Sequence, residues 1–89
     1  NNNYPSQTVN NITLQNIKIY KKDKKYYFTT KAINKTKDDL KLNKIEIKLD
    51  NYKFYSYIGN TLKSDEYKMI FMETNKDIIK TKNIEFIIK

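Results

Sequence analysis

The sequence predicts a small all-β domain, an antiparallel β-sandwich of six to seven short strands. Several segments alternate apolar and polar residues with a period of two, which is the pattern of half-buried strands. Polar turns separate these segments at a spacing of roughly 8–14 residues, as in sandwiches and barrels. The most informative stretch runs from Ser56 to Lys68. An aromatic strand there reaches the only glycine, Gly59, and a new strand starts at Tyr67 after a polar turn.

The N-terminal segment differs in composition from the rest of the chain. Residues 1–11 are rich in Asn, Ser, Gln and Thr and contain the only proline, Pro5. Such a segment is typical of a flexible tether or a frayed terminus. We therefore expect a tether over residues 1–11 and a single folded domain over residues 12–89. Because the chain starts with Asn, we also expect that a targeting segment has been removed ahead of it.

Alternation defines two strands in the first half of the domain. Ile17 and Ile19 alternate with a lysine, whereas Leu14 is out of phase with them. A bulge or a break in the strand is therefore expected near Gln15–Asn16. The second strand is predicted over Tyr26–Asn34, where Thr, Tyr, Phe and Ile favour a pleated, half-buried surface.

The second half of the domain supplies the remaining strands. The clearest alternation runs from Ile45 to Asp50, and further strands are predicted at Tyr52–Ile58, Glu66–Met72 and Asn83–Ile88. With a single glycine in the chain, Asn and Asp are expected to supply the turn positions of positive φ. The predicted core consists of Ile17, Ile19, Phe28, Ala32, Ile45, Ile47, Leu49, Phe54, Ile58, Leu62, Phe71, Ile84 and Phe86.

The composition limits the classes of function. The net charge is +8, and every basic residue is a lysine. A positive surface attracts nucleic acid, anionic lipid and wall polymers alike, but lysine lacks the bidentate geometry with which arginine recognises phosphate. Lys, Asn, Ile and Tyr make up more than half of the chain, and their AT-rich codons indicate a low-GC bacterium as the simpler cause. No apolar run approaches the roughly 20 residues that span a bilayer.

Catalytic and metal chemistry lack the necessary residues. The chain has neither His nor Cys, so a nucleophile would have no imidazole base, and only oxygen ligands remain for a metal. Asp38–Asp39 lacks the spacing of a calcium loop. Asp65 and Glu66 are adjacent and would point to opposite faces of a strand. We expect no enzymatic activity, no cofactor and no metal site.

Turn residues carry a resemblance to a known family. Ala32-Ile33-Asn34-Lys35-Thr36 ends the second strand, and Gly59 and Leu62 precede the turn Ser64-Asp65-Glu66 and the aromatic Tyr67. With the alternating strand between them, these features resemble small bacterial immunoglobulin-like domains of the FxLYD type over about 70 residues. The resemblance implies an immunoglobulin-like sandwich, in which Tyr67 stands where a corner tyrosine bonds the backbone. A structural role for Asn34 is expected even without this resemblance, because an Asn side chain can close a turn by bonding backbone groups.

The chain departs from that family at two places. Leu49-Asp50 lacks the tyrosine of the family's name motif, and Ser64-Asp65 replaces Pro-Gly. The resemblance implies an extracytoplasmic module on lipoproteins or surface proteins with an adhesive or scaffolding role. It supplies no catalytic residues.

Exposed aromatic residues form the candidate binding surface. Tyr55 and Tyr57 lie on the strand face opposite the core, next to Lys53, and Tyr20 and Tyr27 would join them if their strands are neighbours. Tyrosine is enriched at protein interfaces. The same combination of lysine and aromatic rings is also found in single-strand nucleic-acid binders.

Two functions therefore remain open at this point. The first is a non-enzymatic binding or scaffolding module of a bacterial surface protein or lipoprotein. It would be extracytoplasmic, would contact a protein or an anionic cell-envelope polymer, and would meet the membrane only through a removed anchor. The alternative is a cytoplasmic OB-type domain that binds single-stranded nucleic acid. The sequence leaves the oligomeric state open.

Overall fold

The computed structural model describes all residues from 1 to 89 and contains only β-structure. It has no helix long and apolar enough to cross a membrane. The ten strands are β1 (Asn2–Tyr4), β2 (Gln7–Val9), β3 (Ile12–Lys22), β4 (Lys25–Asn34), β5 (Leu40–Lys41), β6 (Lys44–Leu49), β7 (Tyr52–Tyr57), β8 (Thr61–Leu62), β9 (Tyr67–Thr74) and β10 (Ile84–Ile88). The count exceeds the six to seven expected because β1, β2, β5 and β8 are only two or three residues long.

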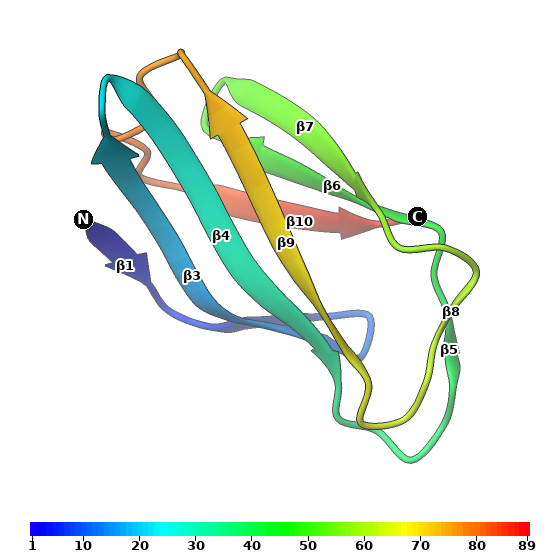
Figure 1. Cartoon of the computed structure of the whole chain (residues 1–89). Helices are drawn as coiled ribbons and strands as arrows, with labels where there is room; N and C mark the ends of the chain where they lie inside the picture. The colour runs from blue at the N-terminus through cyan, green and yellow to red at the C-terminus, as the bar shows by residue number, and fades with distance from the viewer.

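Two antiparallel sheets pack face to face (Figure 1). The first sheet has the order β1-β3-β4-β9, with β2 also paired to β3, and the second has the order β10-β6-β7. A short β5-β8 pair closes one end of the molecule. The six longer strands are, in chain order, β3, β4, β6, β7, β9 and β10. The second of these pairs with the fifth (β4 with β9), and the third pairs with the sixth (β6 with β10). These are the pairings that define an immunoglobulin-like sandwich, so the predicted fold class is confirmed.

The core lies between the two sheets. It contains fourteen buried apolar residues, and eleven partly buried ones pack around them. Phe28 from the first sheet contacts both Phe54 and Phe86 from the second, with ring centroids 5.5 and 6.4 Å apart. Of the predicted core, nine residues are buried, and Phe54, Ile58 and Ile84 are partly buried against it. The sequence prediction missed Ile12, Leu14, Leu42, Ile70 and Ile78.

The prediction for Phe71 was wrong, because this side chain lies on the outer surface with 61% of its area exposed. In β9 it is Ile70 that enters the core. Ile70 stands opposite Thr30 of β4, whose side chain is also fully buried, and this register fixes the phase of the strand. The run Met69-Ile70-Phe71-Met72 is apolar at every position, so alternation alone could not indicate which face is inner.

Residues 1–11 also differ from the expected tether. Asn2–Tyr4 and Gln7–Val9 both pair with β3, on either side of Pro5. Side chains anchor this segment to the loop that precedes β10. Asn2 Nδ2 donates a hydrogen bond to the carbonyl of Ile79 (2.6 Å), and Tyr4 donates to that of Thr81 (2.7 Å). The polar side chains that indicated flexibility therefore bond backbone groups across the molecule.

Turn and bulge chemistry follow the sequence. The β3–β4 register shifts between Gln15 and Lys18, where Asn16 has a φ of 54°, so the predicted bulge is confirmed. It lets Leu14, Ile17 and Ile19 all enter the core. Positive φ values occur at Gly59 and at seven other residues, six of which are Asn or Asp, as expected. These residues are Asn10, Asn11, Asn16, Asp23, Lys24, Asp50 and Asp65.

Asn34 closes the turn after β4, as the sequence indicated. Its side chain is fully buried, and Nδ2 donates to the carbonyls of Asp38 (2.7 Å) and Leu62 (3.0 Å). Its Oδ1 accepts from the backbone N–H and the hydroxyl of Thr36. Tyr67, by contrast, does not act as a corner tyrosine, because it is 54% exposed and stacks under the Lys31 ammonium group, 4.1 Å from its ring centroid.

Candidate binding surface

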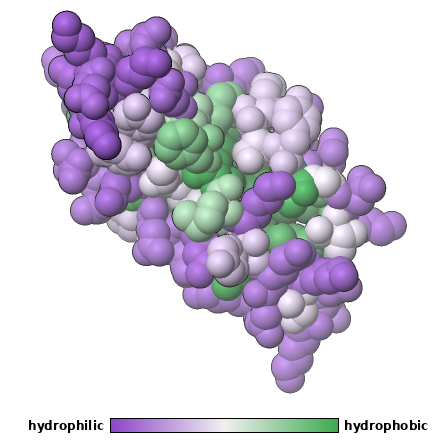
Figure 2. All heavy atoms as spheres, in the orientation of Figure 1, coloured by the Kyte–Doolittle hydropathy of each residue, from purple (hydrophilic) through white to green (hydrophobic).

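The outer face of the first sheet carries large apolar side chains that are exposed and lie outside the core. Tyr67, Met69 and Phe71 all point outward from β9, because they alternate with the inward-facing Ile70. They are 54%, 57% and 61% exposed. Apolar residues gather in the middle of the face seen in Figure 2, bordered by hydrophilic ones. Single exposed apolar residues are ordinary, but a contiguous group on one face indicates an interaction site.

Neighbouring strands extend this group across the sheet. Tyr27 on β4 packs against Phe71, with ring centroids 5.6 Å apart. Tyr20 on β3 stands opposite Tyr27 and stacks on it at 5.0 Å and an interplanar angle of 16°. Offset stacking of this kind holds the rings in one orientation. We call the group formed by Tyr20, Tyr27, Tyr67, Met69 and Phe71 the apolar patch.

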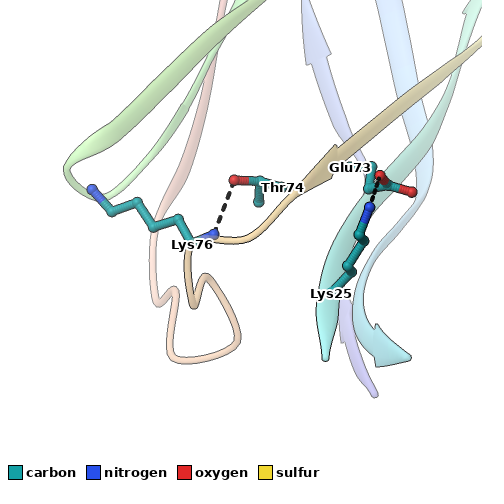
Figure 3. Close-up of polar contacts among 4 residues, drawn as sticks. All are labelled: Lys25, Glu73, Thr74 and Lys76. Atoms are coloured by element: carbon teal, nitrogen blue, oxygen red, sulfur yellow. Dashed lines mark hydrogen bonds and ion pairs between the residues drawn. The ribbon is translucent and has the colours of Figure 1, made fainter. Parts of the chain in front are cut away.

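An ion pair fixes one end of the apolar patch. Lys25 Nζ lies 3.0 Å from Glu73 Oε2 and ties β4 to β9 (Figure 3). The hydrogen bond from Lys25 lowers the pKa of Glu73, and the same bond raises the pKa of Lys25. Burial, reinforced by the charge of Glu73, raises the pKa of the Tyr27 hydroxyl. Beyond β9, the Thr74 hydroxyl accepts from the backbone N–H of Lys76 at 3.1 Å, which shapes the turn that follows (Figure 3).

The outer face of the second sheet has a different character. Tyr55 and Tyr57 lie on β7, and the Lys44 ammonium group lies 4.8 and 5.7 Å from their ring centroids. Glu46 lies nearly buried beside them and pairs with Lys89 at 3.1 Å. The hydrogen bond from Lys89 lowers the pKa of Glu46. Lys44, Glu46 and Lys89 on this face are therefore placed over rings or paired, whereas Lys48 and Lys53 stand opposite each other without an ion-pair partner.

The five residues predicted as a binding surface lie on two opposite faces. Tyr20 and Tyr27 lie on the first sheet, and Lys53, Tyr55 and Tyr57 lie on the second, because β3 and β4 are not neighbours of β7. The prediction missed the most exposed part of the apolar patch, the outward-facing residues of β9. The available signal was the uninterrupted apolar run in β9, since a strand with apolar residues on both faces exposes one of them when it covers only one core.

Acidic residues serve structural roles. Asp39 Oδ1 accepts from the backbone N–H of Ser64 at 3.0 Å, which joins the two loops near Asn34. Asp50 accepts from the backbone N–H groups of Lys82 and Asn83, both at 3.0 Å, and these bonds lower its pKa. No three acidic side chains gather as metal ligands would. A shallow hollow of about 220 Å³ beside Asp50 is open to solvent and mixes Lys and Asp side chains.

Comparisons with protein-family models, curated proteins and solved structures found no match to this chain. The surface must therefore be interpreted from its own chemistry. The apolar patch offers aromatic rings and a thioether, with the Lys25–Glu73 ion pair at its rim. Such a surface is suited to contact with another macromolecule.

Proposed function

We propose that this chain is a non-enzymatic binding or scaffolding module of a bacterial surface protein or lipoprotein, and that it contacts a protein partner through the apolar patch. The observation that carries the proposal is the outward orientation of Tyr67, Met69 and Phe71 on β9. Each exposes more than half of its area beside a core that is already closed. Exposed aromatic residues and Met are the types enriched where proteins bind one another.

The extracytoplasmic location rests on the resemblance to FxLYD-type domains. The strand pairing of an immunoglobulin-like sandwich supports it, since that architecture is common in surface modules. The net charge of +8 would favour contact with anionic cell-envelope polymers near such a module. Lys53 on the second sheet is exposed and available for this secondary contact.

The OB-type alternative has less support. An OB domain presents its nucleic-acid platform on a five-stranded barrel, whereas the sheets here are separate and pack face to face. Of the tyrosines expected to form that platform, Tyr55 and Tyr57 share the outer face of the second sheet, whereas Tyr27 lies on the first sheet. Nucleic acid is therefore retained only as an outcome of the tests and is not proposed as the ligand.

Photo-crosslinking in the source cells tests the proposed function. A photoreactive phenylalanine analogue at Phe71 should capture a defined protein, whereas the same analogue at Tyr57, equally exposed on the opposite sheet, should not. The captured protein would then be purified. Its affinity for the domain should fall at least tenfold in Phe71→Ser and remain unchanged in Tyr57→Ser.

Two results would contradict the proposal. One is crosslinking of equal strength and identity from both positions, which would indicate non-specific contact. The other is protection of the native protein from protease added to intact cells, together with tight binding of single-stranded oligonucleotide that weakens steeply with salt. The second result would restore the nucleic-acid function.

A further inference from the structure

We infer that the partner of the apolar patch is a second copy of this chain, joined antiparallel along the free edge of β9. The two first sheets would then form one continuous sheet, with Met69 and Phe71 of each copy side by side at its centre. This inference rests on the proposed function, because it names the partner of the same surface. It makes the domain a homotypic module.

The outer edge of β9 is open to pairing. β9 pairs only with β4, and no other backbone hydrogen bond reaches residues 67–74. The strand is eight residues long, has a regular register with β4 and contains no proline. Long, regular and apolar edges are those on which other strands add, and proteins usually protect them.

The other sheet edges are shorter or covered. The opposite edge of the first sheet consists of β1 and β2, three residues each and separated by Pro5. On the second sheet, Gln7 Nε2 donates to the Ile84 carbonyl at the start of β10 (2.9 Å). β7 has six residues, two fewer than β9. β9 is therefore the least protected edge.

The sequence of β9 is complementary to itself. An antiparallel twofold pairing centred on Ile70 places Met69 opposite Phe71 of the second copy, and Tyr67 opposite its Glu73. Lys68 faces Met72, so its aliphatic stem can cover the thioether while its ammonium group reaches solvent. No like charges face each other in this register, although two charged residues lie in the strand.

The size of the contact predicts a weak dimer. Edge pairing covers only the flanks of Tyr67, Met69 and Phe71 that face the partner strand, so it buries part of the about 300 Å² of apolar surface that these half-exposed side chains offer per copy. With the strand edges, the total buried area is at most on the order of 1,000 Å², at the low end for specific complexes, which indicates a weak dimer that forms only at high protein concentration. Because each copy carries a charge of +8, screening by salt should strengthen the dimer.

Sedimentation velocity on the purified chain tests the inference. The sedimentation coefficient should rise between about 1 and 500 µM protein, and the dissociation constant should decrease when NaCl is raised from about 0.15 to 0.5 M. Binding to a polyanion would weaken with salt, so the sign of this dependence separates the two kinds of association.

A charge-reversal pair tests the register. The double variant Met69→Lys/Phe71→Lys places two lysines opposite each other at each pair and should dissociate at least tenfold more readily than the native chain. Met69→Glu/Phe71→Lys places Glu opposite Lys and should recover most of the association. Tyr57→Lys on the other face is the matched control and should leave the dissociation constant unchanged. All three positions are exposed, so the fold should be retained, which thermal unfolding would verify.

Amide hydrogen exchange tests the same self-association on the unmodified chain, without any substitution. Protection in residues 67–74 should increase with protein concentration, whereas protection in β7 should not. A chain that remains monomeric at about 500 µM in both salts would overturn the inference, as would association that Tyr57→Lys abolishes. Either result would leave the proposed function intact if the crosslink from Phe71 still captured a different protein. Loss of that crosslink as well would overturn both.

Discussion

At the scale of single residues, Asn34 shows how a buried polar group organises loops. Its side chain bonds the carbonyls of Asp38 and Leu62 and two donors of Thr36, while its backbone bonds Asp65 and Glu66. Every hydrogen-bonding group of the amide is therefore satisfied. The residue joins the turn after β4 to both the β8 segment and the turn before β9.

Replacing Asn34 should be strongly destabilising. In Asn34→Ala, the buried Leu62 carbonyl loses its donor without gaining access to water, and the bonds to Asp38 and Thr36 are also lost, so we expect the free energy of unfolding to fall by about 3 kcal/mol. Asn34→Asp should cost at least as much, since an oxygen would face two carbonyl oxygens. Urea denaturation measures the loss. Asn60→Ala, at an exposed side chain in a neighbouring loop, is the control and should change the free energy by less than about 0.5 kcal/mol.

At the scale of elements, the N-terminal strands depend on contacts that are distant in sequence. β1 pairs with β3, and its Tyr4 hydroxyl donates to the Thr81 carbonyl from a half-buried position that raises the pKa of the phenol. Three-residue strands have little stability alone, so these side-chain bonds hold β1 in place.

Removing one such bond should weaken the domain without unfolding it. Tyr4→Phe keeps the ring and deletes the hydroxyl, so we expect a loss of about 1 kcal/mol in the free energy of unfolding and faster amide exchange in β1. Asn3→Ala alters an exposed neighbour in the same strand and serves as the control. Equal exchange rates in the native chain and in Tyr4→Phe would show that β1 is held by its pairing with β3 alone.

The elements also show which features sequence alone could predict. In a strand that buries only one face, the alternation of apolar and polar residues shows which face is inner. The strand at Ile45–Leu49 and the bulge at Asn16 were therefore predicted correctly. β9 was assigned the wrong phase because its apolar run fits either face, and only its register with β4 selects Ile70. The candidate surface depended on the same missing information. Strand order decides which tyrosines share a face, and no local pattern encodes it.

At the scale of the whole molecule, three carboxylates with lowered pKa values make the stability of the fold depend on pH. The pKa of Glu46 is lowered by Lys89, that of Asp50 by the backbone N–H groups of Lys82 and Asn83, and that of Glu73 by Lys25. These contacts lie on the second sheet, at the start of β10 and on the first sheet. Acid therefore acts on both layers of the sandwich at once.

We expect the domain to lose stability as pH falls below about 4.5. A carboxylate with a lowered folded pKa stabilises the fold above its unfolded pKa, and this contribution disappears as pH falls through the folded pKa. Protonation also leaves the lysine charge unopposed, so repulsion adds to the loss. Glu46→Gln should be less stable than the native chain at pH 7, and the difference should shrink between about pH 5 and pH 2, measured by thermal unfolding. Added salt should relieve the repulsion and leave that difference in place. A difference that stays constant across this range would show that Glu46 contributes through packing and that its charge is immaterial.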